Sequence, residues 1–156
     1  MTTVRVLGFN HTSFTVADLD TVIPFFRDVL GFGLTSRGPR DGAVMSRMTG
    51  IEGVDVTIAH LRGPGHTIEL IQYARPADRD LVIPRMCDTG ASHIALDVDD
   101  VAAAVEAAIE HRMLPVGEIV TIDAGPNRGA RVVYLQNADG LTVELIQKAG
   151  PSTPSQ

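Results

Sequence analysis

The feature that most constrains the fold is an internal repeat. The segment IELIQ at 68–72 returns as VELIQ at 143–147. The segment HTSFTVADLD, which begins at His11, is matched by HIALDVDDVA, which begins at His93. Each half of the chain therefore opens with a histidine and closes with a glutamate in the same local context. Self-similarity of this kind indicates one supersecondary unit that occurs twice.

The pattern after each histidine predicts the same order of elements. Residues 9–17 and 92–98 read as strands. Aspartates that can cap a helix follow both strands, and we expect helices over about 20–30 and up to about Arg112. Shorter β-like runs come next, at 32–37, 43–48, 54–61 and 67–73 in the first half and at 116–122, 130–136 and 141–147 in the second.

These elements predict an α+β fold of two tandem βαβββ modules. Their mixed sheets are expected to curve into a cup with the helices on the outer face. We place the modules at 5–75 and 92–148. The stretch 76–91, which contains two prolines, is expected to be a linker, and the small polar residues of 149–156 a disordered tail.

Composition excludes several classes of function. The net charge is −6, whereas a nucleic-acid binder needs a basic face. Cys87 is the single cysteine, so no intramolecular disulfide can form. No apolar run reaches the roughly 20 residues that span a bilayer, and the N-terminus does not read as a secretory signal. We therefore expect a cytoplasmic protein with a small-molecule substrate and neither nucleic acid nor membrane as a partner.

The repeated histidines and glutamates are candidate metal ligands. Strand alternation places His11 and His93 on the face away from the following helix, among small and polar neighbours. Glu69 and Glu144 lie in the middle of otherwise apolar strands, where an unpaired carboxylate is costly to bury. A bound cation would remove that cost. A lone strand histidine is more often a core residue than a ligand, but recurrence at equivalent positions favours a shared site.

Two imidazoles and two carboxylates suit Zn, Ni, Co, Mn or Fe(II). Four protein ligands leave two further positions open on an octahedral ion. The general order in which such ligand sets bind divalent metals does not identify which of these metals is bound.

With these positions in place, the chain resembles the vicinal oxygen chelate superfamily, which includes glyoxalases, bleomycin-resistance proteins and extradiol dioxygenases. The resemblance covers roughly residues 6–148 and is carried by NHTSFTVADLDTVIPFFRDVLGF, HTIELIQY, SHIALDVDDVAAAVE and NADGLTVELIQ. It implies paired βαβββ modules, a homodimer, and one divalent metal held on the concave side. The positions that match the family's ligands are His11, Glu69, His93 and Glu144.

The four-ligand set is most similar to glyoxalase I and methylmalonyl-CoA epimerase. The resemblance implies an isomerase, epimerase or lyase that removes a proton next to a metal-chelated carbonyl, with Glu144 as the base. Glu52 is the candidate second acid–base group, and Tyr73 and Arg128 are candidate substrate-binding residues. Two alternatives stay open: an Fe(II) dioxygenase on the same scaffold, and a small-molecule binding or resistance protein without turnover. His60 and His66 are expected at the surface, with the mouth of the site as the alternative place.

Overall fold

The computed structural model describes residues 4–150 and divides the chain into two compact units. The first unit is Met1–Arg79 and the second is Asp80–Gln156. The disordered tail expected over 149–156 lies, from residue 151 onward, outside the described residues. Each unit has its own sheet and is described by itself.

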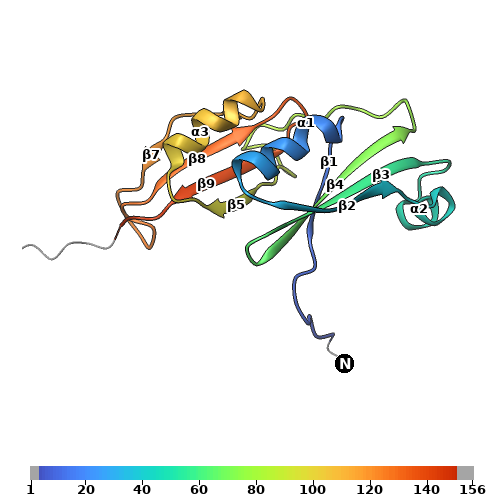
Figure 1. The fold of residues 1–156 in the computed structure, drawn as a ribbon, viewed down its shortest axis with the longest axis horizontal. Helices are drawn as coiled ribbons and strands as arrows, with labels where there is room; N and C mark the ends of the chain where they lie inside the picture. The colour runs from blue at the N-terminus through green and yellow to red at the C-terminus, as the bar shows by residue number, and fades with distance from the viewer. Residues whose placement is uncertain (1–3, 151–156) are drawn as a thin grey trace, which may run out of the picture. The chain divides into compact units, whose positions relative to one another are not determined.

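The first unit is a four-stranded mixed sheet with strand order β1-β4-β3-β2 (Figure 1). Strand β1 runs parallel to β4, and the other pairs are antiparallel. Its elements are β1 (Thr12–Thr15), α1 (Leu19–Pro24), η1 (Phe25–Val29, a π-helical stretch), β2 (Gly33–Pro39), α2 (Gly42–Thr49), β3 (Asp55–Gly63) and β4 (His66–Arg75).

The second unit repeats this plan. Its sheet has the order β5-β9-β8-β6, with β7 paired to β8, and β5 runs parallel to β9. Its elements are β5 (Ile94–Asp97), α3 (Val101–Glu110), β6 (Leu114–Pro115), β7 (Val120–Thr121), β8 (Arg131–Gln136) and β9 (Thr142–Gln147). The predicted α+β class with mixed sheets is confirmed. In residues 4–150, no helix is long and apolar enough to cross a membrane.

The strand expected at 43–48 is wrong, because these residues belong to helix α2. Asp41 caps the helix by accepting a hydrogen bond from the Val44 amide at 3.0 Å. Gly50 ends it in the left-handed conformation, with φ of 72°, and donates to the Ser46 carbonyl. A short apolar run does not by itself distinguish a helix from a strand, and here the two end signals decide for the helix.

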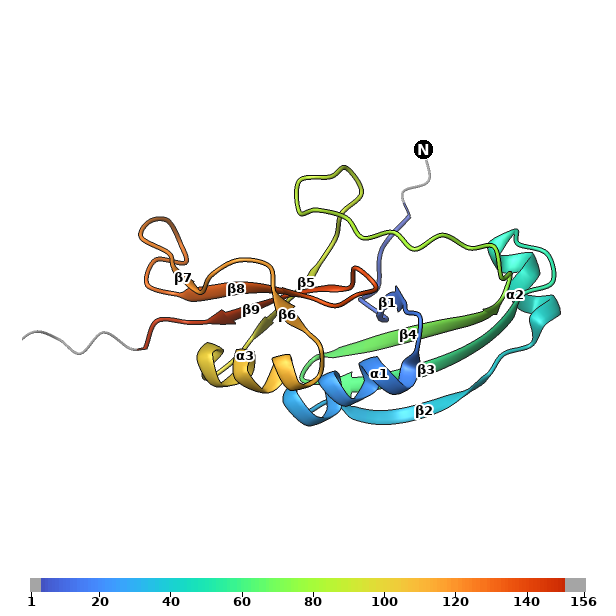
Figure 2. The same cartoon turned by 90° about the horizontal axis from the view of Figure 1, so that it is seen from above.

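Helix α2 packs on the same face of the sheet as Glu69. Met45 is buried and belongs to a cluster with Val54, Val56 and Ile58, against which Ile71 and Tyr73 also pack. Strand alternation places Ile71 and Tyr73 on the face of Glu69. Figure 2 shows α2 at one end of the first unit's strands. An apolar patch therefore continues this face beyond the polar residues around Glu69.

The glutamine of the repeated ELIQ motif joins each sheet to its helix. The side-chain oxygen of Gln72 accepts from the Leu19 amide at 3.1 Å, and that of Gln147 accepts from the Val101 amide at 3.2 Å. Both amides are at the first residue of a helix, where they have no partner within the helix. The neighbouring Leu70 and Leu145 are fully buried on the helix side. The opposite faces of these two strands carry Glu69 and Glu144.

Candidate active site

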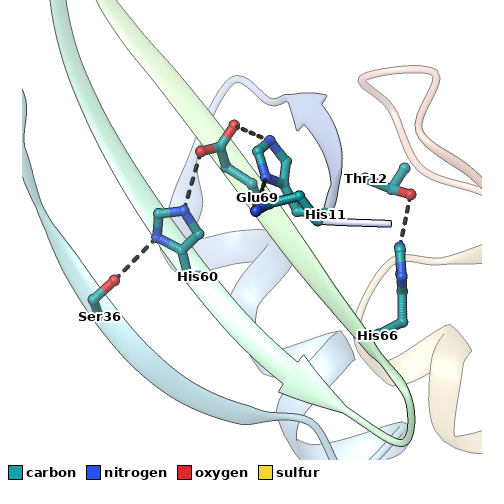
Figure 3. A network of polar contacts seen from close by, with 7 residues as sticks. His11, Thr12, Ser36, His60, His66 and Glu69 are labelled. Carbon is teal, nitrogen blue, oxygen red and sulfur yellow. Dashed lines mark hydrogen bonds and ion pairs between the residues drawn. The ribbon is translucent and has the colours of Figure 1, made fainter. Parts of the chain in front are cut away.

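In the first unit, two histidines meet one glutamate. His11 immediately precedes β1, whereas His60 on β3 and Glu69 on β4 are register partners across an antiparallel pair. His11 Nε2 lies 3.4 Å from Glu69 Oε1, and His60 Nε2 lies 3.1 Å from Glu69 Oε2. Figure 3 shows both rings pointing at the carboxylate from opposite sides. Glu69 is 14% exposed, so its charge is largely withdrawn from water and depends on these partners.

Each of these rings has a second partner. His11 Nδ1 donates to the side-chain oxygen of Asn10 at 2.7 Å. The other nitrogen of His60, Nδ1, lies 3.0 Å from Ser36 Oγ on β2. The two rings approach edge to face, with centroids 6.3 Å apart. The result is a continuous polar network on one face of the first sheet.

The second unit has an equivalent pair with a different neighbour. His93 Nε2 lies 3.3 Å from Glu144 Oε2, and Glu144 is 17% exposed. The register partner of Glu144 is Tyr134, whose ring contacts the His93 ring edge to face at a centroid distance of 5.1 Å. Burial, and in second place the charge of Glu144, raise the pKa of Tyr134 above its usual range. Tyr134 thus occupies the position that His60 holds in the first unit.

Sequence reasoning places His60 at the surface or at the mouth of the site and misses its pairing with Glu69. The available signal was the register of the β3–β4 hairpin. Gly63 pairs with His66 across a two-residue turn, and counting back from that pair brings His60 opposite Glu69. His66 was also expected at the surface, but it is partly buried and its Nε2 lies 2.8 Å from Thr12 Oγ1.

The other predicted site residues lie apart from the His–Glu pairs. Glu52 is exposed in the turn after α2, and Tyr73 packs in the apolar cluster with Met45. Arg128 lies in the exposed loop between β7 and β8. Within residues 4–150, no polar contact joins any of the three to the His–Glu pair of its own unit.

The donor chemistry of each pair fits half of a metal site. Donors at about 2.0–2.2 Å from one ion stand roughly 3.0 to 3.5 Å apart, depending on coordination geometry. The imidazole-to-carboxylate separations of 3.4 Å and 3.3 Å fall in that range. Among the described residues of either unit, no group of three or more His, Cys, Asp or Glu side chains is arranged to hold an ion. Each unit therefore offers two donors of the predicted four.

Comparison with known proteins identifies the family. The model of the Glyoxalase/Bleomycin resistance protein/Dioxygenase superfamily matches residues 8–145. The chain belongs to this superfamily, which confirms the resemblance stated from the sequence.

Named relatives include enzymes of two kinds. The chain is 37% identical over 145 residues to a 2-epi-5-epi-valiolone epimerase of an Actinomyces species, a match that covers 90% of this chain and 79% of the relative. It is 29% identical to a probable lactoylglutathione lyase of Vibrio parahaemolyticus, with 88% of each chain covered. A solved glyoxalase-family protein from Bacillus cereus superposes with a TM-score of 0.81 at 26% identity, covering 96% of this chain and 99% of that one.

Proposed function

We propose that the protein is a divalent-metal-dependent epimerase. The observation that carries this proposal is the His–Glu pair found at equivalent strand positions in both units, His11 with Glu69 and His93 with Glu144. Neither sheet needs a His–Glu pair for its own packing, so the occurrence of the pair in both units supports a shared role in metal binding. The 37% identity to an epimerase favours this reaction among those that members of the superfamily carry out.

The four residues proposed to hold the ion are His11, Glu69, His93 and Glu144. The proposed ion is Zn, Ni, Co, Mn or Fe(II). When bound, such an ion acts as a Lewis acid that polarises a substrate carbonyl and makes the neighbouring C–H more acidic. The donors come from two units, so the proposal rests on the repeat and on donor chemistry.

Proton transfer is assigned to the protein's carboxylates. Glu144 is proposed as the base that takes the proton from the carbon next to the carbonyl. Return of a proton to the other face of that carbon gives the epimer. Glu52 is the proposed second acid–base group, and its exposed turn after α2 would have to approach the substrate. The Tyr73 hydroxyl and the Arg128 guanidinium are proposed to bind substrate oxygens.

The proposed substrate class is a small ketone that carries a hydroxyl on the neighbouring carbon. The epimerase relative is named for 2-epi-5-epi-valiolone, and the proposed substrate class follows that name. An ion held by four protein ligands would have positions left for the two adjacent oxygens of such a substrate. The second candidate is a glyoxalase-type lyase, favoured by the 29% identity to a probable lactoylglutathione lyase.

A deuterium-exchange assay tests the proposal. Protein stripped with EDTA and reloaded with single metals is incubated in D₂O with cyclic α-hydroxyketones, and NMR follows the C–H next to the carbonyl. We expect exchange and epimer formation with metal and loss of both without it. Full activity in stripped protein would refute the proposal. Consumption of O₂ would indicate the dioxygenase, and stoichiometric binding without exchange would indicate a binding protein.

We also propose a homodimer, supported by an exposed apolar segment before β1. Val4, Val6, Leu7 and Phe9 are each at least 84% exposed. A run of large apolar side chains in water is typical of a protein–protein contact. Light scattering after gel filtration is expected to give a dimer, and a Val6→Asp/Phe9→Asp variant to give monomers. A monomeric wild-type protein would refute this.

A further inference from the structure

Two histidines contact the two oxygens of Glu69, and their second partners give them different roles. We infer that His60 is a positioning residue: its Nε2–H holds Glu69 in place, Ser36 fixes its tautomer, and His11 alone of the two rings is a metal ligand. The ligand assignment of His11 rests on the proposed function, whereas the tautomer of His60 does not depend on it.

The contacts of His60 place its proton. An ionised carboxylate only accepts hydrogen bonds, so the 3.1 Å approach of His60 Nε2 to Glu69 Oε2 is favourable only when Nε2 carries hydrogen. In a neutral ring, Nδ1 is then an acceptor. The Ser36 hydroxyl, 3.0 Å away, donates to it. A nitrogen that carries hydrogen has no lone pair to offer a metal, so His60 in this form is a donor to Glu69.

The contacts of His11 place its proton on the other nitrogen. Asn10 Oδ1 only accepts, so the 2.7 Å contact requires hydrogen on Nδ1 of His11. In a neutral ring, Nε2 then presents a lone pair toward Glu69 Oε1 at 3.4 Å. Two acceptors facing one another are favourable when a cation lies between them. The two histidines around Glu69 are thus held in opposite tautomers. Of the two rings, His11 is the one whose Nε2 lone pair is available to a metal ion.

A β-bulge brings Ser36 to its place. The register of β2 against β3 shifts between Leu34 and Ser36, so that Ser36 pairs with His60 and Thr35 is the extra residue. Thr35 Oγ1 donates to the His60 carbonyl at 3.0 Å. Bulges redirect side chains beside functional sites. Here the bulge fixes both the backbone and the ring of His60.

The second unit lacks this anchor. Tyr134 holds the position of His60, and within the described part of the chain no polar contact joins its hydroxyl to Glu144. Glu69 therefore has a polar partner at each oxygen, whereas the polar side-chain contact that residues 4–150 make with Glu144 comes from His93. A carboxylate with one restrained oxygen is the one that can turn toward a substrate.

The first test needs no metal. Long-range ¹H–¹⁵N NMR of the metal-free protein reports which ring nitrogen carries hydrogen, and His60→Gln and His11→Gln variants assign the two signals. We expect hydrogen on Nε2 and none on Nδ1 for His60, and hydrogen on Nδ1 for His11. Hydrogen on Nδ1 of His60, alone or together with Nε2, would overturn the role given to Ser36.

The second test measures Co(II) affinity by titration, with the visible spectrum as a report on ligand geometry. His60→Leu is expected to weaken Co(II) binding about 10- to 100-fold, as loss of an outer-shell partner does. His60→Gln keeps an N–H near the Nε2 position and is expected to restore most of the affinity, and Ser36→Ala to lose only a few-fold. Tyr134→Phe is the matched control in the second unit and should bind Co(II) within about 3-fold of wild type.

The outcomes separate the inference from the proposed function. If wild-type protein binds no Co(II), the proposed function fails while the NMR test of the His60 tautomer still stands. If wild-type protein binds Co(II) and His60→Leu binds it equally with an unchanged spectrum, the positioning role is refuted. Thermal unfolding of the metal-free variants identifies a loss of fold. If His60→Leu unfolds, Ser36→Ala decides the question, and a Co(II) affinity and spectrum identical to wild type in that variant would refute the positioning role.

Discussion

The two units of this chain place the same pair of side chains on the same strands but support it differently. In the first unit, Glu69 is contacted by His11 and His60, and His60 by Ser36. In the second, Glu144 is contacted by His93, and Tyr134 occupies the place of His60. The first unit also carries helix α2 on this face. A duplicated fold can thus keep the same His–Glu pair in both copies while one carboxylate has two histidine partners and the other has one.

The largest expected effect comes from removing the charge of the less restrained carboxylate. Glu144→Gln is expected to lower kcat about 10³-fold, because loss of a general base typically costs 10²–10⁴-fold. Glu69→Gln should act first on metal affinity, and activity should recover partly at high metal concentration. Steady-state kinetics across a metal titration measure both. If high metal concentration restored the activity of both variants equally, the two carboxylates would have the same role.

The second expected effect concerns stability and tests the extra helix of the first unit. Met45→Ala should lower the free energy of unfolding by about 3 kcal/mol, since it leaves a cavity under α2. Met48 lies on the same helix but is 74% exposed, so Met48→Ala is the matched control and should cost less than about 0.5 kcal/mol. Urea denaturation measures both. Similar values for the two would contradict the packing of α2 against Val56 and Ile58.

Sequence reasoning found the parts of this fold that repeat and missed the parts that do not. The strand–helix–strand order and the His–Glu positions recur, so each copy supported the reading of the other. Helix α2 occurs in one copy, and its apolar run alone predicts a strand, whereas the cap at Asp41 and the end at Gly50 indicate a helix. His60 was missed because its role depends on pairing across a hairpin, which alternation within one strand does not reveal.

The third prediction removes the difference between the units. Tyr134→His places an imidazole opposite Glu144, as His60 stands opposite Glu69. If it anchors Glu144, kcat should fall about 10-fold while Co(II) affinity rises a few-fold. The opposite signs of these two effects distinguish anchoring from a general loss of structure, which would lower both. Unchanged kcat with a bound metal would show that restraint of Glu144 does not limit the reaction.

The smallest expected effect tests what the two units share most closely, the glutamine that joins sheet to helix. Gln72→Met and Gln147→Met keep similar volume but leave the first helical amide of α1 or α3 without its acceptor. Each should cost about 1 kcal/mol in urea denaturation, the usual net value of one hydrogen bond. Gln147 also accepts from Arg131 Nη1 at 3.1 Å, so its replacement should cost somewhat more. A cost near zero at both sites would mean that the helices are held by their buried apolar faces alone, and that the glutamine recurs in the repeat for another reason.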